Sequence, residues 1–234
     1  LYDSVSSTKY STKIMNRDGV EVQTIEHLMA ALAGTGIHNA FVEIDGSELP
    51  ILDGSSREFV KNILLVGKQE LEQPINAFRV TKPIEVREGG AWAKLEPSDF
   101  LSIDFWIDYS DTVIGQQNLR LSMKNGTFVR ELCDSRTFCR DSEISVLKAL
   151  GLAKGGNLHN AIVLESTKIR NRGGLRRKDE CVRHKMLDAM GDLSLAGGPI
   201  LAAFSSNRGG HTLTNQLLRA AFLDQGNMVP TTIR

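Results

Sequence analysis

The chain has 234 residues, a formal net charge of zero, 41% hydrophobic residues and 24% charged residues, which is the ordinary composition of a globular protein with a core. Neutrality argues against nucleic acid as the main partner, and no apolar run reaches the length of a bilayer span, so we expect no stable membrane insertion. We expect a cytoplasmic protein, because the first residues lack a secretory signal and the three cysteines form no CxxC pair.

The first third of the chain predicts short strands and two helices. A run of Ala, Leu and Met residues follows Thr24, a suitable N-cap, and ends at glycines, which predicts the first helix. Alternating apolar residues predict a strand at 40–44. The sequence Asp53-Gly54-Ser55-Ser56 predicts a turn and cap before a second helix at 57–65.

From residue 78 onward the pattern is a series of strands followed by helices. Strands are expected at 78–80, 84–86, 91–95, 101–107, 161–164 and 199–204, and helices near 127–133, at 142–150, after Asp179 and at 212–223. The Gly- and Arg-rich segment 171–178 has no periodicity and predicts a mobile loop. Its arginines are either solvated charges or contacts for a phosphate or a membrane surface. Strands followed by helices, twice over and without strict βαβ alternation, favour an α+β fold.

The helix expected after Asp179 contains the most informative motif. Residues four apart share one face of a helix, so His184, Asp188 and Asp192 form a polar stripe. An imidazole one turn from a carboxylate can hold a divalent metal ion, but such pairs also occur as simple hydrogen bonds on solvated helices. Catalytic zinc usually has three protein ligands, so a metal site would need a third ligand from elsewhere in the chain.

Two other histidines lie beside features that suit catalysis. His27 follows Glu26 at the start of the first predicted helix. A buried histidine beside a carboxylate favoured by the helix dipole would explain this pair, and so would a metal ligand beside a general base. His211 lies at the Gly-rich entry to the last predicted helix, a common place for a functional side chain. His38 and His159 are expected to be structural or surface residues.

Seven segments together resemble one known family. They are TIEHLMAAL (24–32), LPILDGS (49–55), SRTF (135–138), GG (155–156) with NAIV (160–163), VRHKMLDA (182–189), GDL (191–193) and GH (210–211). They come in the family's order and span nearly the whole chain. On these segments the chain resembles the zinc-dependent UDP-3-O-acyl-N-acetylglucosamine deacetylases of lipid A biosynthesis.

The resemblance implies two similar two-layer α+β domains, each a sheet packed on two helices, with the active site between them. The first would cover residues 1–74, without the family's opening strands, and the second would cover residues 77–234. An inserted subdomain around 157–179 would shape a passage for an acyl chain. A monomer is expected.

The resemblance also implies a set of site residues. His27, His184 and Asp188 would hold a zinc ion, although two imidazoles and one carboxylate also suit iron or cobalt. The other roles would be a general base (Glu26), an oxyanion donor (Thr137), groups that stabilise charge at the reaction centre (Lys185 and His211), an orienting partner of His211 (Asp192) and a contact of the substrate (Phe138). Either Glu26 or His211 would protonate the leaving amine.

The implied reaction is hydrolysis of the N-acetyl group of an amphiphilic nucleotide-sugar, with release of acetate. Two alternatives stay open: a zinc amidohydrolase for another acylated sugar or small amide, and a diverged copy that binds without turnover. The chain departs from many relatives at Cys139 and Arg140, which follow Phe138 in place of Gly and an aromatic residue, and at Ala91, which replaces a Lys before Trp92. These departures concern the acyl passage and the nucleotide rather than the metal.

Overall fold

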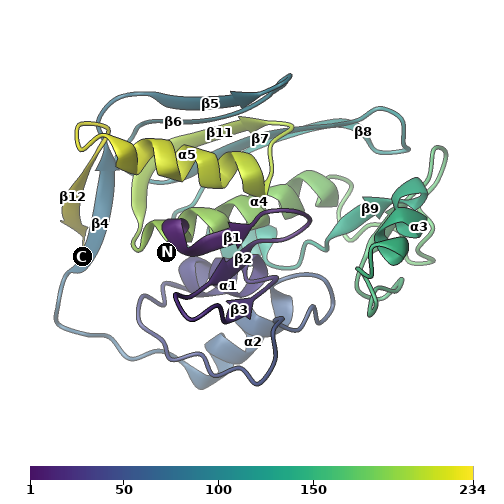
Figure 1. Cartoon of the computed structure of the whole chain (residues 1–234), viewed down its shortest axis with the longest axis horizontal. Helices are drawn as coiled ribbons and strands as arrows, with labels where there is room; N and C mark the ends of the chain where they lie inside the picture. The colour runs from purple at the N-terminus through teal and green to yellow at the C-terminus, as the bar shows by residue number, and fades with distance from the viewer. Residues whose placement is uncertain (234) are drawn as a thin grey trace.

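The computed structural model describes residues 1–233 and has a mixed α+β fold, as predicted (Figure 1). Its largest layer is a seven-stranded sheet with the order β12-β4-β11-β6-β5, in which β7 also pairs with β11 and β8 pairs with β7. The strands are β4 (Ile75–Val80), β5 (Ile84–Glu88), β6 (Ala91–Pro97), β7 (Ser102–Tyr109), β8 (Gly115–Ser122), β11 (Ile200–Asn207) and β12 (Met228–Ile233).

Strand β11 organises this sheet. Its residues 202–207 pair antiparallel with β6, and its residues 203–207 pair in parallel with β7. Ala202, Phe204 and Ser206 are buried while the residues between them are half-buried, which is the alternation of a strand with one face on the core. Helices α4 (Glu180–Leu193) and α5 (His211–Leu223) pack against the sheet (Figure 1).

Helix α4 lies at the centre of the molecule, between the sheet and helices α1 (Glu26–Thr35) and α2 (Arg57–Val66) (Figure 1). Twelve of its 14 residues are buried, so it is enclosed on nearly all sides. Gly191 allows this arrangement, because a Cβ at this position would lie 2.1 Å from the carbonyl oxygen of Glu26. The polar stripe on α4 therefore faces the interior rather than solvent.

The smaller elements lie around these helices. A three-stranded sheet is formed by β1 (Val5–Ser7), β2 (Lys13–Met15) and β3 (Glu21–Val22) and lies beside α1 (Figure 1). A parallel pair of strands, β9 (Phe138–Arg140) and β10 (Ile162–Leu164), lies with α3 (Asp141–Ala149) at the opposite side of the molecule from β12 and β4 (Figure 1). Short 3-10 helices cover Tyr2–Ser4 and Ser194–Ala196, and a π-helix covers Phe128–Leu132. Within residues 1–233, no helix is both long enough and apolar enough to cross a membrane.

Two local predictions in the first third of the chain were wrong. Residues 40–44 form no strand in the described chain, and the side chain of Phe41 is exposed. Alternation selects the face of a strand but does not supply the neighbour with which a strand must pair. Thr24 does not cap α1: its φ angle is +58°, its hydroxyl donates to Glu48 at 2.8 Å, and Ile25 is the N-cap.

Residues 171–178 form no helix or strand, as predicted, but two of the arginines in this segment are paired within the chain rather than solvated. Arg176 forms an ion pair with Asp53 at 2.9 Å, and Arg177 pairs with Glu131 at 3.4 Å. These contacts tie the segment to two other parts of the chain and use the charges that a phosphate would require. The helix expected at 127–133 is reduced to the single π-helical turn.

Candidate metal centre

Helices α1 and α4 bring three potential metal ligands together. His27, His184 and Asp188 are all buried, and each offers a ligand atom within 4.8 Å of the other two. The Oδ1 atom of Asp188 lies 3.3 Å from Nε2 of His184 and 3.7 Å from Nε2 of His27. The two rings meet edge to face, with their centroids 5.1 Å apart. A third potential ligand for the α4 motif therefore comes from the start of α1.

The polar contacts around these ligands test whether a metal ion fits. Nδ1 of His184 donates a hydrogen bond to the carbonyl oxygen of Ser135 at 3.0 Å. The other ring nitrogen, Nε2, therefore keeps a lone pair for a metal ion. Burial lowers the pKa of His184 to about 4, so the ring is neutral at pH 7. Oδ2 of Asp188 accepts from Lys185 at 2.8 Å, whereas Oδ1 is buried without a hydrogen-bond partner in the described chain.

A cation between the rings would satisfy that unpaired oxygen. Burial opposes ionisation of Asp188, but His184 and Lys185 hold the pKa of this carboxyl well below its usual range. Burial likewise opposes the charge on Lys185, and Asp188 outweighs it and raises the pKa of the ammonium. One ionised carboxylate and two imidazoles form a donor set that fits a divalent transition metal.

Glu26 lies next to His27 at the first position of α1. Its side chain is buried, and its Oε2 atom accepts a hydrogen bond from the backbone N–H of Thr12 at 3.0 Å. Burial raises the pKa of Glu26, an effect that His211 and His27 partly oppose. A carboxylate whose pKa is raised above its ordinary value suits a general base, because its affinity for a proton is higher.

His211, at the start of α5, is paired with Asp192 on α4. Nδ1 of His211 donates to Oδ2 of Asp192 at 2.7 Å, and the hydroxyl of Thr12 donates to Oδ1 of the same carboxylate at 2.6 Å. Burial disfavours the charged ring, but Asp192 outweighs it and raises the pKa of His211 to about 9. The ring is therefore an imidazolium at neutral pH, which can stabilise negative charge or donate a proton.

Residues 135–138 form another wall of the site. The ring of Phe138 lies edge-on to His184, with centroids 6.1 Å apart. The backbone N–H of Thr137 donates to the carbonyl oxygen of Gly54 at 2.7 Å. Arg136 makes a buried ion pair with Glu180 at 2.9 Å, which fixes the segment against the first turn of α4. The segment thus supplies the carbonyl that orients His184 and places the ring of Phe138 beside that histidine.

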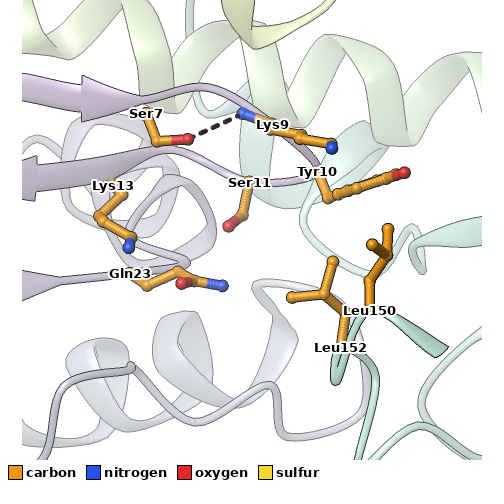
Figure 2. Close-up of a pocket in the computed structure, with 8 residues that line it drawn as sticks. All are labelled: Ser7, Lys9, Tyr10, Ser11, Lys13, Gln23, Leu150 and Leu152. Atoms are coloured by element: carbon orange, nitrogen blue, oxygen red, sulfur yellow. Dashed lines mark hydrogen bonds between the residues drawn. The ribbon is translucent and has the colours of Figure 1, made fainter. Parts of the chain in front are cut away.

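Two hollows are relevant to substrate binding, and the candidate site residue Lys185 lines one of them. One, of about 190 Å³, is lined by Ile107, Asp108, Tyr109, Arg140, Lys185, Arg208 and Gly209. The other, of about 250 Å³, is lined by Ser7, Lys9, Tyr10, Ser11, Lys13, Gln23, Leu150 and Leu152 (Figure 2). In Figure 2 the two leucines lie across this second hollow from the turn between β1 and β2.

Comparison with known proteins identifies the family. Residues 1–222 match the sequence profile of the family described as LpxC, UDP-3-O-acyl N-acetylglycosamine deacetylase. The chain belongs to the LpxC family. The UDP-3-O-acyl-N-acetylglucosamine deacetylases of Shewanella pealeana and Histophilus somni are each 43% identical to it over 225 residues, which is 95% of this chain and 74% of the relative. That of Acidithiobacillus ferrooxidans is 43% identical over 224 residues, or 94% of this chain and 73% of the relative.

Three further residues of this LpxC-family site were missed by the sequence analysis. Ser135 orients His184, Thr12 contacts two predicted site residues, and Ser56 donates to the carbonyl oxygen of His27 at 2.7 Å. Ser135 and Ser56 lie in or next to segments that resemble the family, so their position was a signal. Thr12 lies outside those segments and gave no signal.

Proposed function

We propose that the chain hydrolyses the N-acetyl group of UDP-3-O-acyl-N-acetylglucosamine and releases acetate, with a zinc ion held by His27, His184 and Asp188. The observation behind this proposal is the buried ligand set, with one unpaired carboxylate oxygen, next to the buried carboxylate of Glu26. The relatives are named as deacetylases of this substrate. When bound, zinc would polarise the amide carbonyl and increase the acidity of water.

Glu26 would act as the general base. Because its Oε2 atom already accepts the N–H of Thr12, Oε1 is the oxygen that remains free to take a proton from the attacking water. A general base in such a position typically contributes about 10²–10⁴-fold to the rate.

Three side chains would respond to the charge that develops during attack. The hydroxyl of Thr137 would donate to the oxyanion, and a preorganised donor of this kind contributes about 3 kcal/mol. Lys185 and the imidazolium of His211 would add positive charge, with Asp192 holding the His211 ring in place. The leaving amine would then receive its proton from Glu26 or from His211.

The hollow that contains Lys185 suits the anionic end of an amphiphilic substrate. Lys185, Arg140 and Arg208 line the hollow beside the metal centre, and we assign the anionic diphosphate to it. Lys185 already pairs with Asp188 at 2.8 Å and Arg140 with Asp111 at 2.7 Å, so we expect Arg208 to make the main contact with a phosphate. Arg140 is one of the residues that depart from many relatives, and its guanidinium lies 4.2 Å from the ring of Tyr109. We assign Phe138 to contact with the substrate, because its ring lies beside that of the candidate ligand His184.

The domain arrangement belongs to the same proposal. His27 comes from residues 1–74, while His184 and Asp188 come from residues 77–234, so a site between two domains would take ligands from both. The subdomain at 157–179 would border the acyl passage. We propose that the protein acts as a cytoplasmic monomer on this small-molecule substrate.

Acetate release provides the direct test. The purified protein should contain about one zinc ion per chain, release acetate from UDP-3-O-acyl-N-acetylglucosamine, and lose this activity on chelation. Equal release from free N-acetylglucosamine would favour a broader amidohydrolase. Stoichiometric zinc without any product would favour a copy that only binds its ligand.

A further inference from the structure

We propose that Thr12 is a positioning residue that fixes the general base, Glu26, and the His211–Asp192 pair relative to each other. Thr12 lies just before β2 and is 2% exposed. It contacts α1 through its backbone and α4 through its side chain, so one residue joins two halves of the reaction machinery. This inference rests on the proposed function.

The backbone of Thr12 fixes the start of α1. Its N–H donates to Oε2 of Glu26 at 3.0 Å, and its carbonyl oxygen accepts the N–H of Ile25 at 3.3 Å. The second bond holds the backbone just before α1. The first restrains rotation of the Glu26 carboxylate about its Cγ–Cδ bond by engaging Oε2, which leaves Oε1 for the attacking water.

The side chain of Thr12 completes the contacts of Asp192. Its hydroxyl donates to Oδ1 at 2.6 Å, and Nδ1 of His211 donates to Oδ2 at 2.7 Å. An ionised carboxylate can only accept, so the direction of both bonds is determined. With both oxygens held, the carboxylate cannot rotate freely, and the plane of the His211 ring follows from that of Asp192.

These two functions are separable by mutation because they use different atoms. Thr12→Val keeps the backbone, the β-branch and the volume but removes the hydroxyl, so the contact with Glu26 remains while Asp192 loses one donor. Hydrogen bonds to charged groups contribute about 1.5–3 kcal/mol, so we expect kcat to fall about ten- to a hundredfold. KM and zinc content should change less than about twofold, because neither the ligands nor the hollows are altered.

The conservative variant and a double-mutant cycle distinguish positioning from a structural defect. Thr12→Ser restores the hydroxyl and should recover most of kcat. In an Asp192→Ala background the hydroxyl has no carboxylate to orient, so adding Thr12→Val should lower kcat by less than about twofold further. A matched control is Thr35→Val: Thr35 is also buried, and its hydroxyl donates at 2.8 Å to the carbonyl oxygen of Ala31, away from the site.

A readout that needs neither turnover nor metal completes the test. The proton on Nδ1 of His211 should give a low-field NMR signal, identified by its loss in His211→Gln. In Thr12→Val its exchange with solvent should become at least tenfold faster, while Thr12→Ser and Thr35→Val should leave it unchanged. Unchanged exchange in Thr12→Val would overturn the inference even if the wild-type protein releases no acetate. If the wild-type protein does release acetate, the inference would also be overturned by an unaltered kcat in Thr12→Val, or by equal losses of kcat in Thr12→Ser and Thr12→Val.

Discussion

Replacing Glu26 by glutamine removes the proposed base while nearly preserving its shape. The carbonyl oxygen of the introduced amide can still accept the N–H of Thr12, which now meets Oε2 of Glu26 at 3.0 Å. The amide nitrogen then takes the place of Oε1 and has no lone pair available for a proton. The metal ligands are separate side chains, so zinc content should stay the same.

The size of the effect follows from the proposed role. Loss of a general base costs about 10²–10⁴-fold in rate, which corresponds to about 2.7–5.5 kcal/mol in the activation free energy. The substitution should not destabilise the fold. Burial opposes ionisation of Glu26 and raises its pKa, and a neutral amide places no charge in this buried site. We therefore expect a large fall in kcat at an unchanged melting temperature.

The assay is acetate release at saturating substrate, with zinc quantified in the same samples. Glu21→Gln is a control, because Glu21 is a partly exposed carboxylate that contacts Lys13 at 2.9 Å and Ser6 at 3.4 Å and none of the proposed site residues. If Glu26→Gln keeps kcat within tenfold of the wild-type value with a full complement of zinc, Glu26 is not the base.

Three other changes have defined outcomes. Asp188→Ala should abolish zinc binding and, by leaving the partly buried ammonium of Lys185 without its partner, should lower the free energy of unfolding by about 1–3 kcal/mol, measured by urea denaturation. Asp192 raises the pKa of His211 from 6.5 to about 9. The protonated ring should therefore stabilise the fold fully below pH 6.5, and this stabilisation should be lost as the pH rises through about 9. Asp192→Asn should remove this pH dependence of stability and move the basic limb of the kcat/KM profile to lower pH. Gly191→Ala should lower the melting temperature, since its Cβ would lie 2.1 Å from a backbone oxygen of α1 and overpacking costs about 1–3 kcal/mol.

Each of these outcomes has a comparison that could contradict it. Gly173→Ala introduces a Cβ with no atom within 4 Å, so it should leave the melting temperature unchanged. Equal effects of the two glycine substitutions would refute the close approach of α1 and α4. Full zinc occupancy in Asp188→Ala would remove this residue from the ligand set, and an unshifted basic limb in Asp192→Asn would show that His211 does not govern it.

Local patterns predicted elements whose signals lie within a few residues. The helical period placed His184, Asp188 and Asp192 on one face, and α2, α3 and α5 begin and end within one or two residues of the segments predicted at 57–65, 142–150 and 212–223. Strand 40–44 failed because a strand needs a neighbour, which no local alternation specifies. Thr24 failed as a cap because its hydroxyl contacts Glu48, 24 residues away.

The sequence by itself determined the composition of the site: a carboxylate next to one histidine, and a second histidine one helical turn from an aspartate. The resemblance to a family predicted that these segments meet, but only the tertiary structure decided how they meet. Burial of α4 on nearly all sides turns a stripe that could have been solvated into an interior one. Thr12 joins residues 14 and 180 positions away. Such contacts depend on the packing of whole helices, and no local sequence pattern specifies which residues far apart in the chain will meet.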